Sequence, residues 1–199
     1  MNIKSSIFKT ALLAAGFGLF SANAFCAGTV TGSVDAALPK FKKDVVVYLK
    51  GVPGPIVAKK GVVDQKNLVF EPHVLALPTG SSVDFKNNDK VNHNIFSADV
   101  CNKFNLGTYN PGMSKPPVLF PKPCVVNLLC NVHSEMSGYV VVVDSNYIAV
   151  TDATGKFTIP NVPAGTYDVT VWSEKLKAPA TKVTVANGGT ATVALKLAR

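Results

Sequence analysis

Turn-forming residues interrupt this sequence at short, regular intervals. From residue 28 onward, runs rich in valine and threonine end at turns such as residues 78–82, 152–155 and 163–165, a spacing of about eight to twelve residues that is typical of β-sandwiches. No long amphipathic helical pattern follows the N-terminal segment, and charged residues make up only 16% of the chain. The 199 residues suffice for one medium domain or two small ones. We therefore expect an all-β protein.

The N-terminal segment, residues 1–24, has the pattern of a secretory signal peptide. Two lysines precede an apolar run from Thr10 to Phe20, and an A-x-A sequence ends at Ala24. A membrane anchor is the first alternative, but it needs about 20 apolar residues; lipid attachment at Cys26 is the second. We predict an exported, periplasmic protein cleaved after Ala24, with no transmembrane anchor in the mature chain.

The charge of the chain is basic, with a formal value of +8 that becomes +6 without the two lysines of residues 1–24. A basic balance is common in nucleic-acid-binding proteins, but an exported protein rarely meets nucleic acid, so we expect no such partner. Two interpretations remain: a solvated basic surface, or docking to an acidic redox partner or an anionic surface.

The four cysteines are Cys26, Cys101, Cys124 and Cys130. Export to an oxidising compartment favours a disulfide between two of them. Residues 100–117, rich in Asn, Gly and Pro, are predicted as a long loop. Cys101 and Cys124 lie on either side of a loop-rich segment, and they are the disulfide candidate. Their pairing would leave Cys130 as a free thiol at the end of a strand; no role is predicted for Cys26.

A set of soft donors follows that strand. Cys130, His133 and Met136 have the spacing C-x2-H-x2-M, and His93 lies upstream after a polar turn. Thiolate, imidazole and thioether suit copper, and two histidines, one cysteine and a weak axial methionine describe a blue-copper site. A structural zinc site usually has more Cys or His and no Met. The alternative is a buried thiol beside a surface histidine; we predict a copper site.

Two further residues are weaker ligand candidates. His73 is interpreted as a turn histidine and Met113 as a loop methionine, and neither replaces the four residues above.

The segments FKNNDKVNHNIFS and LLCNVHSEMSGYVVV resemble the ligand strand and ligand loop of cupredoxins, and the short loop is most similar to that of amicyanin. The resemblance covers residues 62–144 and implies a Greek-key β-sandwich that holds one Cu(I)/Cu(II) ion. It also implies that Asn94 ties the ligand strand to the cysteine loop. The implied ligands are His93, Cys130 and His133 in the equatorial positions and Met136 in the axial one. Ser134 and Glu135 depart from the Pro and Phe of the amicyanin loop, so the apolar docking surface beside His133 is altered.

The same resemblance implies a function as a one-electron carrier between redox proteins, with a dehydrogenase as donor and a c-type cytochrome as acceptor. A copper carrier or storage protein without a shuttle role is the alternative. A copper enzyme is ranked lowest, because enzymes of this superfamily need further copper sites and the chain has three histidines. We therefore expect no enzymatic activity and no catalytic residues.

The segment TDATGKFTIPNVPAGTYDVTVWSE resembles the carboxypeptidase regulatory-like β-sandwich, a transthyretin-like module. In that family, strands of the type found at residues 28–51 come shortly before this segment, whereas here the cupredoxin-like residues 62–144 intervene. We therefore predict that residues 28–51 pair with residues 146–199 in one split sandwich. Two consecutive domains are the alternative. No catalytic constellation is found in this sandwich, which is interpreted as a scaffold or partner-binding module.

Overall fold

The computed structural model describes residues 26–199, so the predicted signal peptide lies outside the described residues. The part described is all-β, with one short 3-10 helix, η1. The elements are β1 (Gly28–Asp35), η1 (Pro39–Phe41), β2 (Val46–Lys50), β3 (Lys60–Lys66), β4 (Val69–Glu71), β5 (Val74–Pro78), β6 (Ser81–Lys86), β7 (His93–Ser97), β8 (Phe104–Tyr109), β9 (Ser114–Phe120), β10 (Cys124–Leu129), β11 (Ser137–Val143), β12 (Ile148–Val150), β13 (Lys156–Val162), β14 (Gly165–Trp172), β15 (Thr181–Val185) and β16 (Thr190–Lys196).

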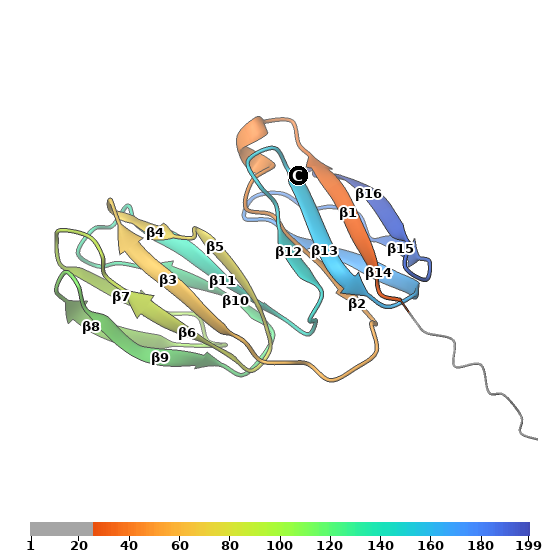
Figure 1. Ribbon diagram of the computed structural model, residues 1–199. Helices are drawn as coiled ribbons and strands as arrows, with labels where there is room; N and C mark the ends of the chain where they lie inside the picture. Colours follow the sequence, from red (N-terminus) through yellow and green to blue (C-terminus); the bar gives the residue numbers. More distant parts are fainter. Residues whose placement is uncertain (1–25) are drawn as a thin grey trace, which may run out of the picture.

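The strands form two sandwiches (Figure 1). The central sandwich, residues 60–143, pairs the sheet β5-β11-β10-β7-β8 with the sheet β4-β3-β6-β9. The terminal sandwich pairs the sheet β13-β1-β16 with the sheet β12-β2-β14-β15. In it, β1 runs parallel to β16, and β2 lies between β12 and β14. Strands from residues 28–50 therefore pair with strands from residues 148–196. The entire central sandwich lies between these two segments in the sequence.

Alternating side chains give each sandwich its own core. In β6, Val83 and Phe85 are fully buried while Asp84 points outward, as expected where one face of a strand covers a core. In β1, a Cβ on Gly32 would lie 2.5 Å from the ring of Phe157 and 2.3 Å from a backbone oxygen of Val193. Glycine at this position therefore lets β13 and β16 pack closely on β1.

The predicted long loop over residues 100–117 is wrong, because most of it forms β8 and β9. Both are edge strands, β8 of the five-stranded sheet and β9 of the four-stranded sheet. Edge strands leave one row of backbone groups unpaired, so they tolerate glycine and proline. Gly107 in β8 and Pro116 and Pro117 in β9 therefore give the sequence a loop-like composition without preventing strand pairing.

An apolar cluster joins the two sandwiches. Val46 of the terminal sandwich packs in one buried cluster with Val74, Val141 and Val143 of the central sandwich, and Trp172 packs against it. The two connecting segments are also tied together, because the side chain of Asn146 accepts a hydrogen bond from Val57 N (2.8 Å) and donates one to the backbone oxygen of Pro55 (2.8 Å). Within residues 26–199, no helix is long and apolar enough to span a bilayer.

Candidate metal centre

Three predicted ligands converge at one end of the central sandwich. His93 is the first residue of β7, Cys130 directly follows β10, and His133 lies in the turn between β10 and β11. The candidate donor atoms of these three residues all lie within 4.8 Å of one another. His93 and Cys130 are buried and His133 is half-buried. Since β7, β10 and β11 are neighbours in one sheet, strand pairing itself brings the donors together.

The imidazole rings of His93 and His133 approach each other with their Nδ1 atoms. Nδ1 of His93 lies 3.1 Å from Nδ1 of His133. Two nitrogen ligands about 2.0 Å from one metal ion in tetrahedral geometry are about 3.3 Å apart, so this separation fits a shared ion. The other nitrogen of His93, Nε2, lies 3.0 Å from Oδ2 of Asp89. A carboxylate in that position orients the ring and leaves Nδ1 for the metal.

Met136 directly precedes β11 and is only 1% exposed. It belongs to the same buried cluster as Cys130. Its backbone N–H donates to the carbonyl of His133 at 3.1 Å, which closes the turn between the two residues. A buried thioether in the same cluster as the thiol matches the donor set that suits copper.

Asn94 connects the ligand strand to the cysteine loop. Its side-chain oxygen accepts a hydrogen bond from the backbone N–H of Asn131, 3.4 Å away, and its amide donates to Oδ1 of Asn105 at 2.9 Å. Asn94 is 1% exposed. The bond holds the residue after Cys130 against the residue after His93.

The loop before His93 is held by a fully buried amide. Nδ2 of Asn87 donates to the backbone oxygens of Val91 (3.0 Å) and Tyr109 (3.1 Å). Asp89, in the same loop, accepts a hydrogen bond from the backbone N–H of Leu68 at 2.8 Å. That bond, with smaller contributions from the N–H of Lys90 and from His93, lowers the pKa of Asp89 to about 2 despite some burial. Asp89 is therefore a stable anion behind the imidazole.

A buried polar pair lies next to the candidate centre and was not predicted from the sequence. Gln65 of β3 is fully buried, and its Nε2 donates to the backbone oxygen of Lys86 (3.1 Å) and to the hydroxyl of Tyr109. Tyr109 pairs directly with His93 across β7 and β8. Burial, with a smaller effect of the nearby Asp64 charge, raises the pKa of Tyr109 well above its usual range, although the hydrogen bond from Gln65 acts to lower it. Tyr109 therefore stays neutral in the buried cluster that also contains Cys130. Gln65 and Tyr109 lie far apart in the chain, so no local pattern marks them.

The weaker candidates lie elsewhere. His73 contacts the carbonyl of Ser137 (3.1 Å) and Oε2 of Glu174 (3.3 Å) at the junction of the two sandwiches. Met113 is 48% exposed in the turn between β8 and β9. Cys26 is an exposed free cysteine.

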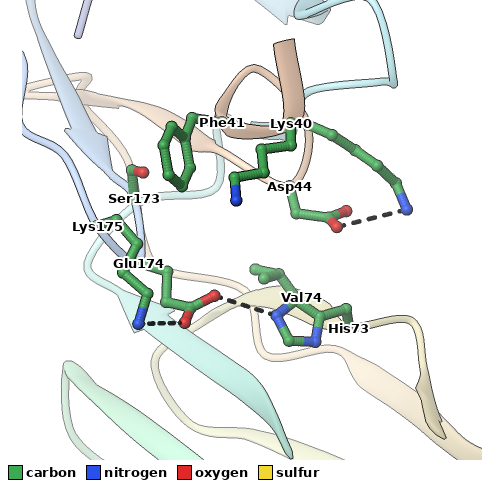
Figure 2. A pocket seen from close by; sticks show the side chains of 9 residues that line it. Lys40, Phe41, Asp44, His73, Val74, Ser173, Glu174 and Lys175 are labelled. Carbon is green, nitrogen blue, oxygen red and sulfur yellow. Dashed lines mark hydrogen bonds and ion pairs between the residues drawn. The ribbon is translucent and has the colours of Figure 1, made fainter. Parts of the chain in front are cut away.

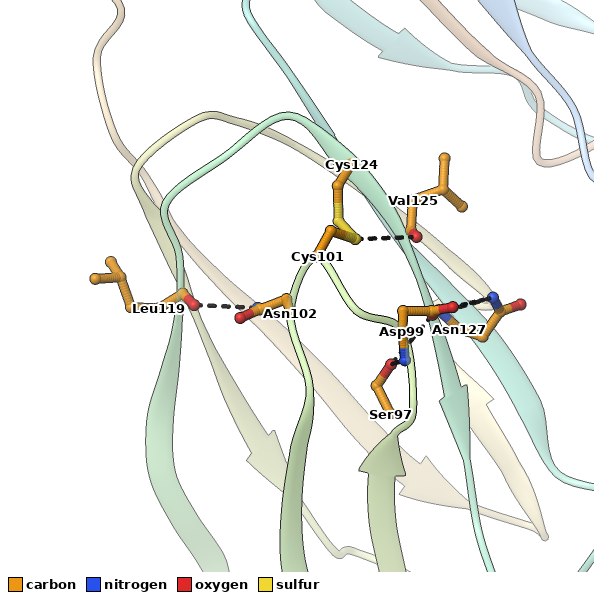
Figure 3. The surroundings of a disulfide bond; sticks show 8 residues. All are labelled: Ser97, Asp99, Cys101, Asn102, Leu119, Cys124, Val125 and Asn127. Carbon is orange, nitrogen blue, oxygen red and sulfur yellow. Dashed lines mark hydrogen bonds between the residues drawn. A yellow bond between two sulfur atoms is a disulfide. The ribbon is translucent and has the colours of Figure 1, made fainter.

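Cys101 and Cys124 are joined by a disulfide (Figure 3). Close to it, the carboxylate of Asp99 accepts hydrogen bonds from the backbone N–H of Asn127 (2.6 Å) and from the hydroxyl of Ser97 (3.1 Å). Burial acts to raise the pKa of Asp99, but the bonds from Asn127 and Ser97 outweigh it, so this pKa lies below its ordinary value. Disulfide and carboxylate together fasten the loop after β7 to β10.

Because the pKa of Asp99 is lower in the folded protein, its ionised form stabilises the fold above about pH 4 and loses this effect as the pH falls further. We expect Asp99→Asn to lower the free energy of unfolding by about 1 kcal/mol at neutral pH, and the difference from wild type to shrink in acid. Urea unfolding at several pH values measures this. Asp168→Asn, which removes only an exposed contact with Lys182, is the control; a difference for Asp99→Asn that does not change with pH would contradict the assignment.

One protein-family model, polysaccharide lyase family 4, domain II, matches residues 125–193. No curated protein matches the chain. Among solved structures, the chain is similar to a purple cupredoxin from Nitrosopumilus maritimus, with 27% identity, 42% of this chain and 99% of that chain covered, and a TM-score of 0.38. It is also similar to a mutant of amicyanin in its reduced Cu(I) form (19% identity, 49% and 98% covered, TM-score 0.39). A third is the copper-containing nitrite reductase of Thermus scotoductus (20% identity, 55% and 28% covered, TM-score 0.40).

The family match runs from β10 into β16 and so includes strands of both sandwiches. The carboxypeptidase regulatory-like character of the terminal sandwich stays a prediction. The case for a metal centre depends on the donors, their distances and their burial.

Proposed function

We propose that this protein is an exported, periplasmic type 1 copper protein that carries single electrons between redox partners. The observation that carries the proposal is the convergence of His93, Cys130 and His133 within 4.8 Å. Met136, buried in the same cluster as Cys130, completes the donor set. Copper bound by these four residues would supply the exchange of one electron between Cu(II) and Cu(I).

The fold suits this role because it restrains the ligands. Paired strands hold His93, Cys130 and Met136 at their ends, and hydrogen bonds accepted by Asn94 and Asp89 restrain the cysteine loop and one imidazole. A site that keeps its geometry in both oxidation states needs little rearrangement when an electron enters or leaves. His133 is the least buried of the four and would be the route to a partner.

Exposed apolar side chains lie close to that route. Val132 directly precedes His133 and is 46% exposed, and Val91, two residues before His93, is 42% exposed. Leu68, whose N–H binds the same carboxylate as His93, is also exposed. These residues would make a small apolar contact surface for a redox protein, with a dehydrogenase as donor and a c-type cytochrome as acceptor by analogy with amicyanin. No catalytic role is proposed.

Titration of the mature protein with Cu(II) tests the proposal. We expect one equivalent to bind and to produce an intense visible band from thiolate-to-copper charge transfer. Reversible one-electron voltammetry would then favour an electron carrier over a copper storage protein. A colourless one-to-one complex would contradict the proposed site, and a coloured complex with no reversible redox wave would contradict the shuttle role.

A further inference from the structure

Two cavities of opposite character adjoin at the η1 end of the terminal sandwich, and both are lined by Phe41. The polar cavity, of about 230 Å³, lies where η1 and the end of β14 meet the central sandwich (Figure 2). The apolar groove has a volume of about 330 Å³. Both volumes are of the order of small-ligand sites. The chain continues directly from Lys175 in the first cavity to Leu176 in the second.

The polar cavity has more cations than anions. Lys40, Lys43 and Lys175 line it together with two carboxylates, Asp44 and Glu174. Both carboxylates already have partners. Asp44 lies 3.5 Å from the ammonium of Lys43, and Glu174 lies 2.9 Å from that of Lys175 and 3.3 Å from Nε2 of His73.

Lys40 is the cation without a carboxylate. Its ammonium lies 5.2 Å from the ring centroid of Phe41, and it makes no ion pair within residues 26–199. In Figure 2, Lys40 and Phe41 face Glu174 and His73 across the cavity. An incoming anion would therefore find an exposed ammonium here that is not yet neutralised.

The apolar groove is lined mainly by hydrocarbon. Leu38, at the start of η1, is 50% exposed although it lines a concave surface. Leu176 and Leu197 also line it, and the backbone pairing of Lys177 with Ala198 joins their two segments. Arg199 is also among the residues that line it. A basic group beside an open apolar surface is the arrangement that suits an anionic, partly apolar ligand.

The charge of the chain is concentrated on the same sandwich. Residues 28–51 and 146–199 contain ten Lys and Arg against five Asp and Glu, whereas residues 52–145 contain eight against seven. The long-range field therefore attracts anions to the terminal sandwich more than to the metal centre.

We propose that the two cavities form one binding site for an anionic amphiphile. The carboxylate or phosphate head group binds beside Lys40 in the polar cavity, and the apolar chain lies in the groove between Leu38 and Leu176. A free fatty acid and an anionic lipid in a bilayer offer this same chemistry. The site is independent of copper, because none of the four candidate ligands lines either cavity.

The test uses the full mature chain without copper, titrated with decanoate below its micellar concentration and followed by calorimetry. Trp172, the only tryptophan, directly precedes Ser173 of the polar cavity and provides a fluorescence signal. We expect saturable binding that is weakened about tenfold by Lys40→Glu and about tenfold by Leu38→Asp. Lys103→Glu and Leu119→Asp, at exposed positions of the central sandwich, are matched controls and should bind as wild type does.

Sedimentation with phosphatidylcholine vesicles, with and without phosphatidylglycerol, distinguishes the sources of the ligand. Salt-sensitive binding to the anionic vesicles alone supports a lipid in a bilayer, and decanoate binding without vesicle binding supports a free amphiphile. The proposal is overturned if neither binds, if decanol binds as tightly as decanoate, or if the control variants lose as much affinity as the cavity variants. None of these results depends on whether the protein binds copper.

Discussion

The Cys130→Ser variant is expected to lose the visible charge-transfer band completely and to bind copper more than about a hundredfold more weakly. Removing a residue that merely orients a ligand costs about 10- to 100-fold in metal affinity, so removing the thiolate itself should cost at least as much. The band should vanish because it needs a thiolate bound to copper. Visible absorption and competition with a copper chelator measure the two effects.

Cys26→Ser is the matched control for this experiment. Cys26 is the other free cysteine among the described residues, but it is exposed, whereas Cys130 is 5% exposed. The Cys26 variant should keep the band and the affinity of the wild type. Colour that survives in Cys130→Ser and disappears in Cys26→Ser would place the metal elsewhere and reject the proposed centre. Thermal unfolding of both copper-free variants shows whether the loss of affinity reflects loss of the fold.

Leu49→Ala is expected to lower the free energy of unfolding by about 2–5 kcal/mol, the usual cost of an empty space left by a buried leucine. Leu49 of β2 is 1% exposed, and it pairs with Val169 of β14, so it lies within the terminal core although it belongs to the N-terminal part of the chain. Urea unfolding, followed by the fluorescence of Trp172 on the adjoining strand, measures the loss.

Leu38→Ala serves as the control, because Leu38 is already 50% exposed and its truncation should change stability by about 0.5 kcal/mol or less. A Leu49→Ala protein as stable as the Leu38→Ala protein would mean that β2 is not part of a packed core. That result would also contradict the prediction of one sandwich built from residues 28–51 and 146–199.

The general architecture could be predicted from the sequence because its signals are local. Turn residues and alternating apolar positions mark most strands, and the all-β class is confirmed. The edge strands β8 and β9 were missed because glycine and proline are tolerated at edges, where composition no longer separates strand from loop. The partners of β1 and β2 could be proposed only from a family resemblance, since nothing within residues 28–51 indicates which distant strands complete the sheets.

The candidate ligands could also be predicted, because Cys130, His133 and Met136 are close in sequence and chemically distinctive. The residues that surround these ligands could not be predicted from the sequence. In the sequence, Asp89 cannot be distinguished from other turn residues, because only the folded chain brings it next to the ring of His93. Its low pKa depends mainly on the backbone N–H of Leu68, which lies in another hairpin. Gln65 and Tyr109 meet only because β3 and β8 belong to facing sheets of one sandwich.

The parallel pairing of β1 with β16 affects the order in which the chain can fold. Gly28–Asp35 pairs with Thr190–Lys196, so the first described strand must wait for the last to leave the ribosome. Residues 60–143 contain all the strands of the central sandwich and can pair earlier. The central sandwich would thus be complete while β1 and β2 remain open edges, which are prone to non-native pairing. Completion of the terminal sandwich would then be the slow, late step, because contacts between the two ends of a chain form slowly.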